Sequence, residues 1–189
     1  MEKLFELYPA LFGAEFKPLK LGIFQELLAA HPGVLDKDTL KLALSVHTRS
    51  TRYLNSVAAG MQRHDLAGQP VEDLAPEHIY FAVLELHRRR LLRAPEDMKA
   101  KLHRQLCSQL IGLFEASGLE RQDYLARVQT NDTQANSVLE EALALRDEWV
   151  AKEAALLSAY DASGKTPVEF ADMYGMNLRD VKAALARRG

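Results

Sequence analysis

The chain has 189 residues and a formal net charge of −2, with 48% hydrophobic and 26% charged residues, values ordinary for a soluble globular protein. A single cysteine, Cys107, excludes an intramolecular disulfide, and no apolar run approaches the roughly 20 residues that span a bilayer. The first residues carry mixed charge and lack the apolar region of a signal peptide, so we expect a cytoplasmic protein with no membrane partner.

Apolar residues at helical spacing predict five helices in the first half of the chain. The predicted ranges are residues 2–12, 22–30, 37–47, 51–58 and 76–93. Asp36 suits the N-cap of the third helix, and either Thr48 or Ser50 suits that of the fourth. Residues 61–74 have the pattern of a small β-hairpin, with Ala67 and Gly68 in its turn.

A domain boundary is expected near Ala94 and Pro95, which gives one domain over residues 1–93 and a helical C-terminal region over 94–189. The helices predicted in the second part span about residues 96–116, 119–129, 133–160, 167–174 and 178–187. The predicted fold class is therefore mainly α with a small β-hairpin, followed by an all-α C-terminal region.

The stretch from Thr48 to Leu54 places two arginines, three hydroxyl residues and a tyrosine at a predicted helix start. Free N–H groups, hydroxyl caps and nearby arginines at such a position suit a phosphate. Residues 37–63 contain five basic residues and one acidic residue, Asp38. This local positive charge in a near-neutral protein points to nucleic acid rather than to a metabolite. The residues that carry this interpretation are Thr48, Arg49, Ser50, Thr51, Arg52, Tyr53, Arg63, Lys20, Lys37 and Lys41.

Three features in this half of the chain have two possible roles each. Tyr53 could offer its hydroxyl to a phosphate or ribose and its ring to a base, or it could be a core residue. His47 follows the apolar stripe of its helix, which favours a core histidine over a ligand-binding one. Arg88–Arg90 could contact phosphates or could simply form a solvated helix end.

No catalytic constellation stands out. The histidines are scattered, without metal-ligand spacing or a cysteine partner, and neither common glycine-rich phosphate loop is present. We therefore expect no enzyme, no metal and no cofactor.

Several segments resemble the ProQ/FinO family of bacterial RNA chaperones, over about residues 5–92. The matching pieces keep the family's order and spacing, and they are Pro18–Gln25, Leu40–Leu44, Thr48–Leu54, Gly60, Arg63, Asp65–Leu66, Gly68 and Pro70. The resemblance implies a mainly helical domain with a small hairpin that binds structured RNA ending in a terminator stem-loop with a U-rich 3′ tail. It also implies partners among small RNAs and mRNA 3′ ends, and a role in post-transcriptional regulation.

The same resemblance assigns roles to the residues. Thr48, Arg49, Ser50, Thr51, Arg52, Tyr53 and Arg63 are expected in the pocket for the RNA 3′ end. Lys20, Lys37 and Lys41 are expected along the backbone of the duplex stem. Duplex RNA is recognised by shape and phosphate contacts, whereas ends and single strands are recognised in pockets.

The C-terminal region has one weak pattern of its own. Ala171, Gly175, Val181 and Ala184 match the spacing of a helix-turn-helix over residues 167–187. The alternative function is therefore a DNA-binding or protein-adaptor role for the C-terminal helices, although a small helical packing unit has the same pattern.

Overall fold

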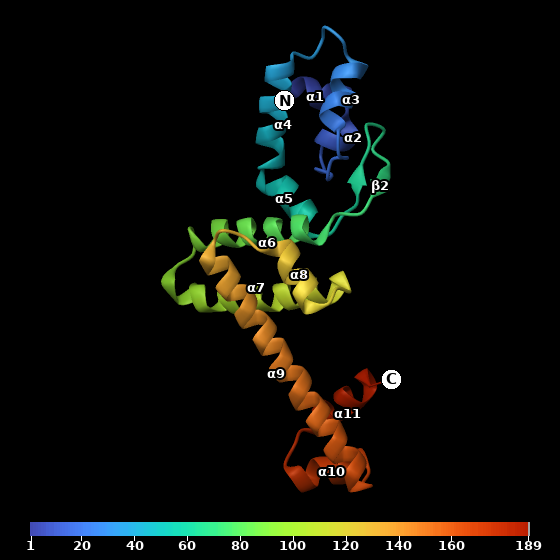
Figure 1. Ribbon diagram of the computed structural model, residues 1–189, viewed down its shortest axis with the longest axis vertical. Coiled ribbons are helices and arrows are strands. Elements are labelled where there is room, and N and C mark those ends of the chain that lie inside the picture. The colour runs from blue at the N-terminus through green and yellow to red at the C-terminus, as the bar shows by residue number, and fades with distance from the viewer. Residues whose placement is uncertain (189) are drawn as a thin grey trace. The chain divides into compact units, whose positions relative to one another are not determined.

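The computed structural model describes residues 1–188, and it is mainly helical with one antiparallel hairpin, as the sequence predicted (Figure 1). The helices are α1 (Glu2–Leu7), α2 (Pro9–Phe12), α3 (Ile23–Ala30), α4 (Lys37–Thr48), α5 (Thr51–Ala58), α6 (Pro76–Leu91), α7 (Glu96–Ser117), α8 (Arg121–Val128), α9 (Thr133–Ser163), α10 (Pro167–Tyr174) and α11 (Leu178–Arg187). The strands are β1 (Arg63–His64) and β2 (Pro70–Glu72). None of the helices in this described range has the length and apolar character that crossing a membrane requires.

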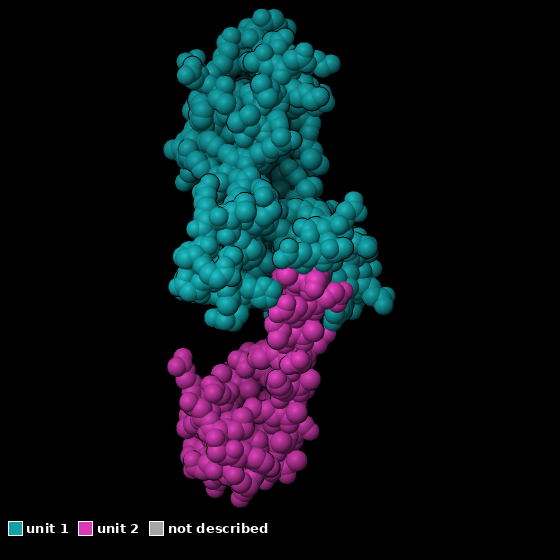
Figure 2. All heavy atoms as spheres, turned by 90° about the vertical axis from the view of Figure 1, so that its left-hand side faces the viewer, with its two compact units in different colours: residues 1–136 teal, residues 137–189 magenta. Residues whose placement is uncertain are grey.

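The chain forms two compact units, residues 1–136 and 137–189 (Figure 2). The boundary expected near Ala94 and Pro95 lies between α6 and α7, inside the first unit. A separate domain over residues 1–93 therefore stays a proposal.

The first predicted helix, residues 2–12, is two helices. Tyr8 leaves the helical conformation with φ −136° and ψ 64°, and Pro9 begins α2. Proline has no N–H to donate to the preceding turn, and its ring disfavours the α conformation in the residue before it, so the break falls at Tyr8.

The hairpin is shorter than the predicted range, and a third segment joins it. Gly68 has the left-handed φ of +75° that its turn requires, as the sequence predicted. Leu19 forms an isolated parallel bridge with His64. The His64 N–H donates to the Pro18 carbonyl at 2.7 Å, and the Lys20 N–H donates to the His64 carbonyl at 2.9 Å. The segment before α3 is thereby fixed to β1, which local sequence patterns did not predict.

An aromatic cluster surrounds His47 in the core of the first unit. The His47 side chain is 1% exposed, and its ring centroid lies 4.3 Å from that of Phe16, 4.8 Å from Phe12 and 5.3 Å from Tyr53. Neither ring nitrogen of His47 has a hydrogen-bond partner. Burial, with a smaller contribution from the Arg52 charge, lowers the pKa of His47 to about 4. The predicted core role of His47 is confirmed.

Helices α6, α7 and α8 also belong to the first unit and pack on one another. Tyr80 on α6, Leu110 on α7 and Tyr124 on α8 are each 0% exposed. The second unit has its own small core, in which Phe170 and Val181 pack with Leu156 and Tyr160.

We expect the stability of the first unit to fall as the pH drops from about 6.5 to about 4. The folded state keeps His47 neutral until pH about 4, whereas the unfolded chain takes up a proton near pH 6.5. The free energy of unfolding should therefore lose up to roughly 3 kcal/mol from this residue over that interval. Urea unfolding of the wild type and of His47→Leu at several pH values should show the smaller pH dependence in the variant. An NMR titration of the His47 ring with a midpoint near pH 6.5 would contradict the prediction.

Candidate nucleic-acid interface

The backbone of Leu19 holds two of the predicted site residues. The Leu19 N–H donates to the Tyr53 hydroxyl at 3.1 Å, and Arg63 Nη1 donates to the Leu19 carbonyl at 2.9 Å. Tyr53 is 7% exposed, and its burial raises the pKa of the phenol. The ring is buried, so of the two roles left open for Tyr53 the structure favours the core role for the ring.

Arg63 is also held from several sides. Its Nη2 lies 3.2 Å from His78 Nδ1, its Nε lies 3.8 Å from Glu72 Oε1, and its side chain is 11% exposed. The same Glu72 oxygen accepts the Leu21 N–H at 3.2 Å. A guanidinium has five N–H donors, so these contacts fix the orientation of Arg63 and still leave donors for a ligand.

The start of α5 has the structure that the hydroxyl pattern indicated. Ser50 is the N-cap, and its Oγ accepts the Tyr53 N–H at 3.2 Å. Thr48 does not cap α5, because its hydroxyl donates to the Leu44 carbonyl at 2.9 Å. Within residues 1–188, the N–H groups of Thr51 and Arg52 have no acceptor, as is usual in a first helical turn.

Two arginines of this stretch lie beside the helix start. Arg52 donates to the Ala14 carbonyl and lies 4.3 Å above the centroid of the Phe16 ring. A contact of this kind orients the guanidinium and leaves its charge at the surface. The Arg49 side chain is exposed, and its carbonyl oxygen has a partner from another helix.

That partner is Arg89 of α6, a residue that the sequence did not place at this site. Arg89 Nη2 donates to the Arg49 carbonyl at 2.8 Å, and Arg89 Nη1 donates to Thr51 Oγ1 at 3.0 Å. Glu85 pairs with Arg89 at 2.7 Å and with Arg88 at 2.8 Å, and these hydrogen bonds lower the pKa of Glu85 to about 2. Arg88–Arg90 is therefore more than a solvated helix end. The only advance signal was its charge, because nothing local indicates a contact with residues about 40 positions earlier.

The three predicted backbone lysines do not form one cluster. Lys20 lies beside β1 and pairs with Glu26 at 2.6 Å, which raises the pKa of the Lys20 amine. Lys37 and Lys41 lie one turn apart on α4, exposed and without a carboxylate partner among the described residues. In Figure 1, α4 and the hairpin stand at opposite edges of the N-terminal part, with α1, α2 and α3 between them.

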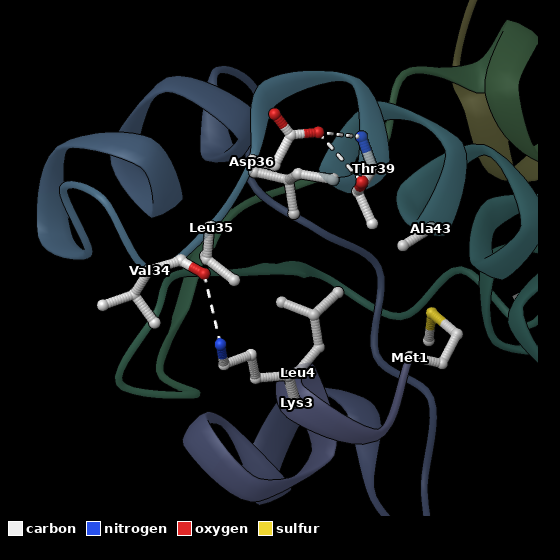
Figure 3. A pocket seen from close by; sticks show the side chains of 9 residues that line it. Met1, Lys3, Leu4, Val34, Leu35, Asp36, Thr39 and Ala43 are labelled. Atoms are coloured by element: carbon white, nitrogen blue, oxygen red, sulfur yellow. Dashed lines mark hydrogen bonds between the residues drawn. The ribbon is translucent and has the colours of Figure 1, made fainter.

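A separate hollow of about 200 Å³ opens between α1 and the start of α4 (Figure 3). Its polar groups are occupied, since Lys3 donates to the Val34 carbonyl and Asp36 accepts from both Thr39 N and Thr39 Oγ1. These bonds lower the pKa of Asp36, which keeps a negative charge at the rim. None of the predicted site residues line this hollow, and it is poorly suited to a phosphate.

The expectation that no histidine has a cysteine partner is wrong. His103 does have a cysteine partner, because its Nε2 lies 3.8 Å from Cys107 Sγ on α7. The spacing of four residues places both side chains on one face of the helix, and this spacing was visible in the sequence. Cys107 itself is buried.

In the second unit, the residues of the helix-turn-helix pattern pack as both a helix-turn-helix and a small packing unit require. Ala171, Val181 and Ala184 are buried, and Gly175 ends α10 with φ +62°. Two basic residues at the C-terminal end are paired within the unit: Arg187 with Glu153 at 2.6 Å, and Arg188 with Asp161 at 2.6 Å.

Comparison with known proteins gives matches to the N-terminal half of the chain. A family model described as "ProQ/FINO family" matches residues 1–99. A protein named RNA chaperone ProQ from Shewanella oneidensis is 44% identical over 102 residues, which cover 52% of this chain and 46% of that protein. One of the same name from Aeromonas salmonicida is 47% identical over 83 residues, covering 42% and 40%. The matched part of the chain thus spans less than half the length of these curated relatives.

A solved structure is also similar, that of a FinO-like RNA chaperone from Neisseria meningitidis MC58. It is 36% identical in sequence, with a TM-score of 0.39, and the match covers 43% of this chain and 83% of that chain.

The Tyr53→Phe substitution should destabilise the protein by about 1–3 kcal/mol, because it leaves the Leu19 N–H buried without an acceptor. Urea unfolding measures this change. Tyr174→Phe is the matched control, since Tyr174 is 55% exposed, and its effect should stay within about 0.5 kcal/mol. Equal effects of the two substitutions would show that the Leu19–Tyr53 hydrogen bond contributes nothing to stability.

Proposed function

The chain belongs to the ProQ/FinO family, and on that premise we propose that it is a cytoplasmic RNA chaperone rather than an enzyme. Its proposed ligands are structured RNAs, namely terminator stem-loops with a U-rich 3′ tail, in small RNAs and at mRNA 3′ ends. Bound in this way, the protein protects the 3′ end and promotes pairing between RNAs. The names of its relatives support RNA as the ligand.

The observation that carries the proposal is the convergence at Leu19. The Leu19 N–H donates to the Tyr53 hydroxyl on α5, and the Leu19 carbonyl accepts from the Arg63 guanidinium on β1. Both side-chain groups are therefore fixed beside the same backbone segment. The Tyr53 hydroxyl accepts one hydrogen bond and can still donate another. A donor pair fixed in this way suits the hydroxyl and phosphate oxygens of an RNA chain end better than it suits a continuous strand.

The start of α5 would supply the remaining contacts of the 3′-end pocket. The N–H groups of Thr51 and Arg52 are available, and the first turn of a helix carries a partial positive charge. The proposed pocket keeps its predicted members, with Tyr53 acting through its hydroxyl: Thr48, Arg49, Ser50, Thr51, Arg52, Tyr53 and Arg63.

The duplex stem would lie along separate lysines. Lys37 and Lys41 on α4 have no acidic partner to displace, whereas Lys20 would exchange its pair with Glu26 for a phosphate. Exposed ion pairs contribute little to stability, so this exchange has a small cost. In the second unit, Arg187 pairs with Glu153 and Arg188 with Asp161, and these exposed pairs could be exchanged for phosphates in the same way.

A terminator hairpin with its U tail should bind about tenfold to a hundredfold more tightly than the same hairpin without the tail, the scale of one or two pocketed nucleotides. Fluorescence anisotropy at fixed salt measures both affinities. A hairpin with the same tail moved to its 5′ end is the control and should bind like the tailless one. Equal affinity for all three RNAs would exclude a 3′-end pocket.

Lys37→Ala and Lys41→Ala should each reduce the slope of log K against log salt concentration by about one unit. The reason is that each exposed ammonium would neutralise one phosphate of the stem. Lys99→Ala on α7, where Lys99 already pairs with Glu96, is the matched control and should leave the slope unchanged. Unchanged slopes for the two α4 variants would place the stem elsewhere.

A further inference from the structure

A second hollow lies within the first unit, among α5, α6 and α7. Its volume is about 190 Å³, which corresponds to about six water molecules at roughly 30 Å³ each. This is room for one ring-sized group. The surface that lines it is mostly polar and includes the side chains of Asn55, Arg90 and Gln109, with a small apolar contribution from Ala58, Val83 and Leu86.

The polar lining has unused hydrogen-bonding capacity. Among the described residues, the side chains of Asn55, Arg90 and Gln109 make no hydrogen bond or ion pair, and all three are exposed. Glu85, on the same helix as Arg90, pairs with Arg88 and Arg89 instead. Arg90 therefore keeps its charge uncompensated, and the two amides each offer donors and an acceptor. The hollow therefore offers a ligand both a positive charge and neutral hydrogen-bonding groups.

The hollow also adjoins the proposed 3′-end pocket. Asn55 follows Thr51 by four residues on α5, so the two share one helix face about 6 Å apart along the axis. On α6, Arg90 directly follows Arg89, which donates to Thr51 Oγ1 and to the Arg49 carbonyl. An RNA strand that runs from the start of α5 along this face would thus reach the hollow within one helical turn.

We infer that this hollow is a second nucleotide subsite, which binds one unpaired nucleotide of the RNA tail upstream of the terminal ones. The edge of the base bonds to the amides of Asn55 and Gln109, and its phosphate pairs with Arg90. Amides recognise base edges and guanidinium groups recognise phosphates, so the chemistry of the polar lining matches a nucleotide. The inference rests on the proposed function, because it assigns the tail a path beyond the 3′-end pocket.

The test uses the full chain and two terminator hairpins, one with a long U tail and one with the tail shortened to its terminal nucleotides. Arg90→Gln and Gln109→Ala should each weaken binding of the long-tailed hairpin by about tenfold, the scale of one charged hydrogen bond or one base contact. Binding of the short-tailed hairpin should stay unchanged. Arg93→Gln is the matched control, because Arg93 is exposed just beyond the end of α6 and does not line the hollow.

The outcomes separate this inference from the proposed function. If Arg90→Gln and Gln109→Ala weaken both hairpins equally, or weaken neither, the subsite is wrong while the 3′-end pocket stands. A loss of the same size in Arg93→Gln would indicate a general charge effect and would also overturn the subsite. A wild-type chain that binds the hairpin equally well with and without any tail would overturn both proposals.

Discussion

The arrangement of the candidate site depends on the two hydrogen bonds made by the backbone of Leu19. Leu19 is itself 5% exposed, and a buried N–H or carbonyl needs a partner, which here comes from Tyr53 and Arg63. The bonds therefore act in both directions, because they satisfy the backbone and they also orient the two side chains. They join the segment before α3, the start of α5 and strand β1, three parts of the chain that are far apart in sequence. A change at any of the three would move the hydroxyl and the guanidinium together.

A second set of contacts connects α6 to the same helix start. Glu85 positions Arg89, and Arg89 in turn holds the Arg49 carbonyl and the Thr51 hydroxyl. The Glu85 carboxylate is 30% exposed, and ion pairs at such exposure contribute little to stability. Its effect is on geometry and charge. By pairing with Arg88 and Arg89 it neutralises part of the cluster and directs one guanidinium toward α5, whereas Arg90, beside the α5–α6–α7 hollow, has no ion pair within residues 1–188.

The helices could be predicted from the sequence because their signals are local. Ser50 and Asp36 cap the helices that follow them, and Gly68 provides the turn of the hairpin. Two of the missed features were local, namely the break before Pro9 and the His103–Cys107 contact, and the others depend on residues distant in sequence. Neither the Leu19–His64 bridge nor the Arg89–Thr51 contact has a periodic pattern. The sequence left the environment of Tyr53 open, because its neighbours Thr51 and Arg52 are exposed while its own ring packs against His47.

Burial is the main cause of the neutrality of His47, and the charge of Arg52 adds to it. Arg52 lies 4.3 Å from the centroid of the Phe16 ring, and the Phe16 ring centroid lies 4.3 Å from that of His47. A proton on His47 would place a second positive charge beneath the guanidinium in a site without a hydrogen-bond partner, and both burial and the Arg52 charge oppose it. While His47 is neutral, the aromatic cluster presents a π face on which Arg52 can rest. Arg52, at the start of α5, thus packs on an aromatic cluster whose histidine, His47, stays neutral.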